Sequence, residues 1–214
     1  MSLETLKDKV ARLIEKAQSG AQESTGIILS DFTGSYQQPK KADMRSLVIT
    51  ESAQTYFNNI FSDLFSNSNG NSNGGYYVLL EEVYLPENMT VFSGSMFSYC
   101  SNLTTLHGDF SKVRTIDAYA FRNCKKMPNI PPCPNLQTIG NSAFLTCTAL
   151  TEVTLPATIT NIHTNAFSGC TNLLNIYVPW AEGAVANAPW GATNATIHYN
   201  TTFDENGNPI ATEV

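Results

Sequence analysis

The five cysteines are the residues of this sequence best suited to chemistry, because thiols bind metals, act as nucleophiles and form disulfides. Four of them, Cys100, Cys124, Cys147 and Cys170, are separated by 24, 23 and 23 residues. Zinc sites usually draw two ligands from one short knuckle such as C-x-x-C, and the sequence contains none. The regular spacing therefore predicts a structural role for these four thiols, and no metal site.

No other residue pattern indicates catalysis. The three histidines, His107, His163 and His198, stand in no catalytic or metal motif, and no G-x-S-x-G, H-E-x-x-H, phosphate-binding or dinucleotide fingerprint occurs. A glycosidase needs a pair of carboxylates in a cleft, yet between residues 127 and 200 the only acids are Glu152 and Glu182. We expect neither enzymatic activity nor a cofactor.

The cysteines belong to a longer repeat. A phenylalanine precedes each by three residues, at Phe97, Phe121, Phe144 and Phe167, and the consensus reads Ile-x3-Ala-Phe-x2-Cys-x2-Leu-x2-Ile-x-Leu-Pro. One such unit cannot bury its own apolar side chains, whereas stacked units bury each column against the next copy. The repeat predicts an α/β solenoid of about four to five 23-residue coils, with short parallel strands and these Phe and Cys residues in the core.

The segment IGNSAFLTCTALTEVTLPATITNIHTNAFSGCTNLLNIYVP, residues 139–179, resembles the BspA-like leucine-rich repeats of bacterial surface proteins and of phage and prophage proteins. The resemblance covers residues 79–179 and implies a right-handed superhelix that serves as a binding or structural module without catalytic residues. The closing stretch VPWAEGAVANAPWGATNATIHYN is similar to the end of repeat proteins carried by prophages of gut bacteria.

Coils are numbered here from their first strand, so that coils one to four begin near Val83, Leu106, Ile130 and Val153. Coils two and three depart from the consensus: coil two has an extra residue and coil three reads Pro131-Pro132-Cys133-Pro134. This run predicts an irregular surface loop that includes Cys133, either a tolerated insertion or a variable binding surface.

For the four periodic cysteines, free thiols are favoured, although the coil spacing also permits disulfides.

The flanking regions divide the remaining chain. Residues 1–20 form a predicted amphipathic helix with Leu3, Leu6, Val10, Leu13 and Ala17 on one stripe, suited to homo-oligomerisation or attachment, or to packing against the solenoid. Residues 21–78 are a flanking or capping region with two candidate strands at residues 26–32 and 46–50 and a flexible Asn/Gly/Ser loop. Residues 180–214 are a cap and tail.

Two tryptophans characterise the C-terminal cap. Trp180 and Trp190 follow the last regular proline, where large rings can cover the exposed core of the final coil, or alternatively form a platform for sugars. The tail from Asp204 onward is expected to be loose.

Charge and hydropathy narrow the partners and the location. With 12 basic and 18 acidic residues and a net charge of -6, nucleic acid is an unsuitable partner, and no apolar run is long enough for membrane insertion. The charged N-terminus is unlike a signal peptide. We therefore expect cytoplasmic synthesis and a virion-associated structural role in a tail, baseplate or fibre. A bacterial cell-surface adhesin with its signal removed, or a carbohydrate-binding module, is the alternative.

One outward row of side chains is the candidate binding surface. Strand periodicity places Tyr84, His107, Pro131, Thr154 and Tyr177 between inward positions, in a row we call the outer row. Tyrosine and sparse charge suit a glycan or an uncharged protein on a cell or virion surface. The alternative is an ordinary solvated sheet face.

Overall fold

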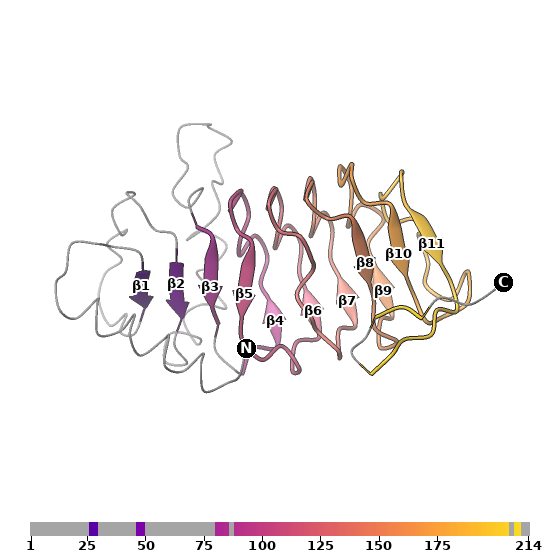
Figure 1. Ribbon diagram of the computed structural model, residues 1–214, viewed down its shortest axis with the longest axis horizontal. Coiled ribbons are helices and arrows are strands. Elements are labelled where there is room, and N and C mark those ends of the chain that lie inside the picture. Colours follow the sequence, from indigo (N-terminus) through magenta and orange to yellow (C-terminus); the bar gives the residue numbers. More distant parts are fainter. Residues whose placement is uncertain (1–25, 30–45, 50–79, 86–87, 206–207, 211–214) are drawn as a thin grey trace.

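Short parallel strands stacked coil upon coil build the described part of the chain (Figure 1). The computed structural model describes residues 26–29, 46–49, 80–85, 88–205 and 208–210. The strands form two layers, called here the front layer and the back layer, which enclose a continuous apolar core. The predicted solenoid is thus confirmed. The predicted helix of residues 1–20 and the loop of residues 66–75 lie outside the described residues.

The front layer consists of two parallel sheets. Their strands are β1 (Gly26–Leu29), β2 (Ser46–Ile49), β3 (Glu82–Tyr84) and β5 (Thr105–His107) in the first sheet, and β8 (Glu152–Thr154), β10 (Asn175–Tyr177) and β11 (Thr196–His198) in the second. From β3 onward the central residue of each strand points inward, as the pairs Val83↔Leu106 and Val153↔Ile176 show. β1 pairs with β2, and β2 pairs with β3. The stack of strands therefore begins before residue 79.

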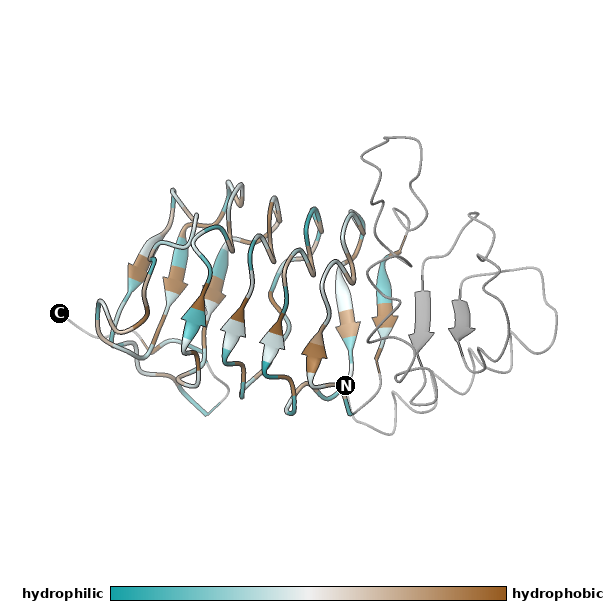
Figure 2. Cartoon of the chain, turned by 180° about the vertical axis from the view of Figure 1, so that it is seen from behind, coloured by the Kyte–Doolittle hydropathy of each residue, from teal (hydrophilic) through white to brown (hydrophobic). Residues whose placement is uncertain are grey.

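The back layer is one continuous sheet of two-residue strands. It contains β4 (Val91–Phe92), β6 (Thr115–Ile116), β7 (Thr138–Ile139) and β9 (Asn161–Ile162), in that order. The second residue of each strand is completely buried. Figure 2, seen from behind, shows the hydrophobic residue that each of these strands contributes.

A ladder of phenylalanine rings runs through the core. The rings of Phe97, Phe121, Phe144 and Phe167 are fully buried, and successive ring centroids lie 5.5, 5.4 and 5.4 Å apart. The rings of the last two pairs are nearly parallel, with interplanar angles of 5° and 6°. Each ring therefore packs against its own copy in the adjacent coil, which fixes the spacing of the coils.

The cysteine column is tied to this ladder by hydrogen bonds. The thiols of Cys124, Cys147 and Cys170 donate to the phenylalanine carbonyl of the preceding coil, over 3.2, 3.1 and 3.0 Å. The same carbonyls already accept the backbone N–H of the cysteine three residues later, as that of Phe121 does from Cys124 at 3.1 Å, so the thiol of the next coil is a second donor in a side chain small enough for the core. All five cysteines of the chain are free.

The residue before each periodic cysteine has a left-handed backbone conformation. The φ angles are 66° at Tyr99, 60° at Asn123, 61° at Thr146 and 73° at Gly169. Only at Gly169 does the sequence use the residue that adopts this conformation without steric cost. The first three coils therefore carry local strain that the surrounding packing must hold in place.

Coil five closes the C-terminal end with an aromatic cap. Trp190 is completely buried, its indole N–H donates to the carbonyl of Ala186 at 2.7 Å, and its carbonyl accepts from the N–H of Phe167 at 2.9 Å. Trp180 is half-buried against the same core. Trp190 is therefore part of the cap and is inaccessible to a sugar.

Phe144→Ala is expected to lower the free energy of unfolding by about 3 to 5 kcal/mol, because it removes a ring stacked on both sides and leaves a cavity. Urea denaturation measures this loss. Leu174→Ala is the matched control, since Leu174 is 56% exposed and its truncation should cost little. Equal losses in the two variants would contradict the ring ladder.

At the residue before each periodic cysteine, where the backbone is left-handed, two substitutions should change stability in opposite directions. A Cβ at Gly169 would lie 3.0 Å from Oγ1 of Thr146, at a φ that disfavours side chains, so Gly169→Ala should cost about 1 to 2 kcal/mol. Thr146→Gly should instead raise stability by about 0.5 to 1 kcal/mol, because relieved strain exceeds the added chain entropy. Thermal or urea unfolding of both variants checks the signs; stabilisation by Gly169→Ala would refute the assignment.

Candidate functional site

The front layer is interrupted at coil three. The first sheet ends at β5 and the second begins at β8, and residues 126–132 between them form no strand. The back layer shows no such interruption, because coil three contributes β7 between β6 and β9. The break therefore opens one side of the solenoid and leaves the other closed.

Two prolines explain why coil three has no front strand. In other coils, an N–H just before the strand donates to the preceding coil, as Thr104 does to Glu81 at 2.9 Å and Leu174 to Thr151 at 2.9 Å. The repeat places Pro128 at the equivalent position. Proline has no N–H, so this bond cannot form.

The second proline removes the bond at the far end of the strand. There the residue after the strand donates to the following coil, from Leu85 to His107 at 2.8 Å and from Leu155 to Tyr177 at 3.0 Å. Coil three has Pro132 at this position. With both end bonds missing, residues 126–132 make no backbone hydrogen bond to β5 or β8.

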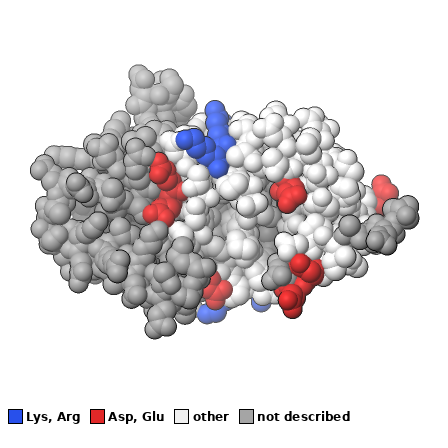
Figure 3. All heavy atoms as spheres, viewed as in Figure 1, with Lys and Arg blue, Asp and Glu red and all other residues white. Residues whose placement is uncertain are grey.

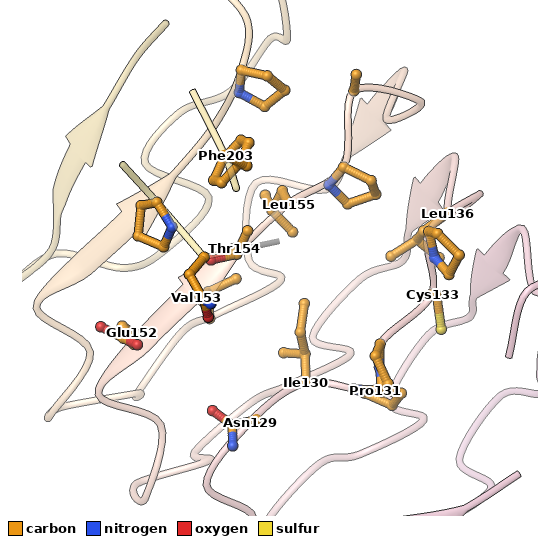
Figure 4. A pocket seen from close by; sticks show the side chains of 17 residues that line it. Asn129, Ile130, Pro131, Cys133, Leu136, Glu152, Val153, Thr154, Leu155 and Phe203 are labelled. Atoms are coloured by element: carbon orange, nitrogen blue, oxygen red, sulfur yellow. The ribbon is translucent and has the colours of Figure 1, made fainter. Parts of the chain in front are cut away.

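A pocket of about 760 Å³ lies beside this break (Figure 4). One wall comes from coil three, a second from β8 and its following turn, and a third from the C-terminal segment. The lining residues are Asn129 to Pro134, Leu136, Glu152 to Ala157, Pro179, Phe203, Asn208 and Pro209.

The pocket lining is apolar apart from backbone groups and a few polar side chains. Six of its residues are prolines, and Ile130 and Phe203 add half-buried apolar surface. Glu152, which is exposed, is the one charged residue in the lining. The site thus suits an apolar group with a neutral or positively charged neighbour.

The C-terminal segment is ordered where it borders the pocket. Phe203 and Pro209 form an antiparallel bridge, and the Asp204 carboxylate accepts from the backbone N–H and the side-chain amide of Asn208 at 2.8 and 3.0 Å. The expectation of a loose tail from Asp204 is therefore wrong for the described residues. Local Asx hydrogen bonding holds this turn together.

The outer row does not form one continuous surface. Tyr84 is 3% exposed and its ring stacks on His107, with centroids 4.3 Å apart, so it offers almost no surface to a partner. Pro131 is buried, because coil three leaves strand geometry there. Thr154 lines the pocket, and half-buried Tyr177 stacks on His198 at 4.7 Å.

Polar contacts support both aromatic stacks. Nε2 of His107 lies 3.2 Å from Oε2 of Glu82, and Nε2 of His198 lies 2.9 Å from Oδ1 of Asn175.

His198 was absent from the predicted row because the closing strand lacks the repeat consensus. Ile130 and Phe203 were also missed, and only the proline run hinted at a hollow there.

Cys133 is buried in the core, so its predicted place on a surface loop is wrong. It is 5% exposed and occupies the turn position that Phe110 fills in coil two, also buried. In both turns the carbonyl accepts from the N–H three residues later, at Leu136 and Val113. Burial raises the pKa of the Cys133 thiol from 9.0 to about 12.

Comparison with known proteins agrees with this architecture. Six copies of the BspA type leucine rich repeat region match residues 40–111 and 108–183. The repeat and the fold define a protein-interaction or surface-type module, of a kind that is generally non-enzymatic. The chain belongs to the BspA type leucine-rich repeat family.

Three solved structures are similar in fold. A leucine rich repeat protein of T. pallidum shares 22% identity with a TM-score of 0.53, over 83% of this chain and 70% of its own. One from Bacteroides ovatus shares 20% identity at 0.57, over 82% and 42%. A leucine rich cell surface protein from Faecalibacterium prausnitzii shares 18% at 0.50, over 87% and 53%. No curated protein matches the chain in sequence.

Metal and membrane features are absent from the described ranges. No group of three or more His, Cys, Asp or Glu side chains there could hold a metal ion. Among the same residues, no helix has the length and apolarity needed to cross a bilayer.

The buried thiol predicts a pH dependence of stability. Because the pKa of Cys133 is higher in the folded state than in the unfolded chain, its contribution is complete below about pH 9 and is lost as pH rises toward 12. Wild type should lose stability faster than Cys133→Ala by up to about 1.4 kcal/mol per pH unit in that window. Urea denaturation at several pH values measures both slopes; parallel slopes would show that the thiol ionises freely.

Proposed function

We propose that this chain is a protein-interaction module that binds a partner protein through the front layer, at the break in coil three. The observation that carries the proposal is the coincidence of that break with a pocket of about 760 Å³ lined mainly by apolar residues. A regular solenoid face of this width has no hollow, because each strand pairs with the next. Departure from the repeat therefore gives this face a hollow beside a broken sheet.

Charge on this face supports a protein partner over nucleic acid. Figure 3 shows that the described part of the front layer is mostly uncharged, with scattered acidic and basic groups. Nucleic-acid binding requires clustered positive charge. A largely uncharged surface instead matches the centre of protein interfaces, where charged residues are depleted.

The same module fits a location outside the cytoplasm. We place it on a virion, as a tail, baseplate or fibre component, where the front layer contacts the host surface. A cell-surface adhesin is the second candidate, and the similar fold of the Faecalibacterium prausnitzii cell surface protein favours it. Immunoblots of purified phage particles and of protease-shaved cells separate these locations, because a virion component copurifies with particles and an adhesin is lost on shaving.

Site-specific photocrosslinking tests the binding face. Benzoylphenylalanine in place of Tyr177 should capture one dominant protein partner, since this half-buried residue of β10 is the register partner of Thr154, which lines the pocket. The same group at Asn161, an exposed residue of β9 in the back layer, is the control and should capture at least tenfold less. Equal labelling at both positions, or labelling at Asn161 alone, would remove the front layer as the interface.

A further inference from the structure

We infer that the break is a docking site for an extended segment of the partner protein, which adds a strand to the open edge of β8. The inference rests on the proposed function and names the form in which the partner binds. The segment would contribute the front strand that coil three does not provide.

The edge of β8 toward coil three has backbone groups without backbone partners. On its other edge, β8 pairs with β10 in register, and the bond from Leu155 to Tyr177 extends that ladder. Alternate peptide groups of a strand point to opposite edges, so those of Glu152 and Thr154 face coil three. None of the described residues 126–132 forms a backbone hydrogen bond with them.

Equivalent positions elsewhere show what the missing bonds are. Thr105 in coil two, the counterpart of Glu152, donates to Glu81 at 3.1 Å, a bond that Glu152 does not make. The carbonyl of Thr154 corresponds to that of Tyr177, which accepts from Leu155. Its own donor would be the N–H of residue 132, which is Pro132. An incoming strand can supply these donors and acceptors, as peptides do at other open sheet edges.

The pocket next to this edge selects the side chains of the segment. Its volume lies in the range of ligand-binding pockets, roughly 300 to 1,000 Å³, so it has room for more than one side chain, and its apolar lining favours aliphatic or aromatic ones. Glu152 is the one charged lining residue and lies on the strand itself. The preferred segment is therefore extended and uncharged, with an apolar anchor and a lysine or arginine close to it.

A random octapeptide library displayed against the full chain tests this inference. Selection should enrich extended sequences with an apolar residue near a basic one, and Glu152→Gln should weaken the best of these peptides about tenfold. Binding is measured by fluorescence anisotropy. In hydrogen exchange, the peptide should slow the amides of Glu152 and Thr154 at least tenfold and leave Asn161 of β9 unchanged.

Restoring the sheet should abolish binding. Pro128→Thr with Pro132→Leu introduces the residue types found at equivalent positions, Thr104 and Leu155, and returns both missing donors. The double variant should bind the selected peptide at least tenfold more weakly and protect Glu152 and Thr154 without any ligand. Asn161→Thr is the control and should bind normally.

Peptides with single N-methyl groups keep the inference testable if the double variant does not fold. N-methylation at alternate positions should reduce binding at least tenfold, and at the intervening positions only slightly, because only one set of N–H groups faces β8. Uniform effects would overturn strand addition. Failure to enrich any peptide while benzoylphenylalanine at position 177 still captures a protein would also overturn it and leave the proposed function standing.

Discussion

The mutual dependence of the coils is the constraint on which the structure rests. A coil of about 23 residues contributes one or two short strands and a few large apolar side chains, too little to form a core alone, so each coil is stable only against its neighbours. The stacked phenylalanine rings fix the spacing, and the thiol hydrogen bonds of the cysteine column join successive turns. Residues on the surface therefore recur with the same period of about 23 residues.

Because two layers share the core, one layer can open without loss of the fold. Pro128 and Pro132 remove donors from the front layer of coil three only, while β7, Phe144 and Cys147 keep their places in the back layer and the core. An isolated sheet interrupted in this way would leave two edges to solvent, a hazard for aggregation. Here the neighbouring prolines and the C-terminal turn partly cover the break, which limits pairing to a segment that fits the pocket.

The repeat made the core predictable from sequence, because identical environments recur in every coil. The Phe and Cys positions and the parallel strands follow from a pattern of apolar residues that is repeated at least four times, while the cap at Trp190 follows from the need to cover the core of the last coil. Predictions failed where a residue's environment occurs once. Cys133 was placed on the surface because Pro156 marks that position as a turn, yet a turn residue in this fold can point inward, as Phe110 also does.

The outer row was predicted as one continuous exposed surface, and the structure departs from that shape for a physical reason. Strand periodicity correctly separates inward from outward positions, but exposure depends also on the neighbouring coils, and the side chain of Tyr84 is covered although it lies beside the apolar core cluster rather than within it. Periodicity also assumes a strand, and at Pro131 there is none. Counting backbone hydrogen-bond donors in the sequence would have located the break better than side-chain polarity did. Pro128 and Pro132 stand at positions whose N–H groups link adjacent coils, and they mark the coil whose front strand cannot form. In a solenoid the identity of a residue at a linking position thus determines where the sheet opens, and therefore where a specific site can exist on an otherwise periodic surface.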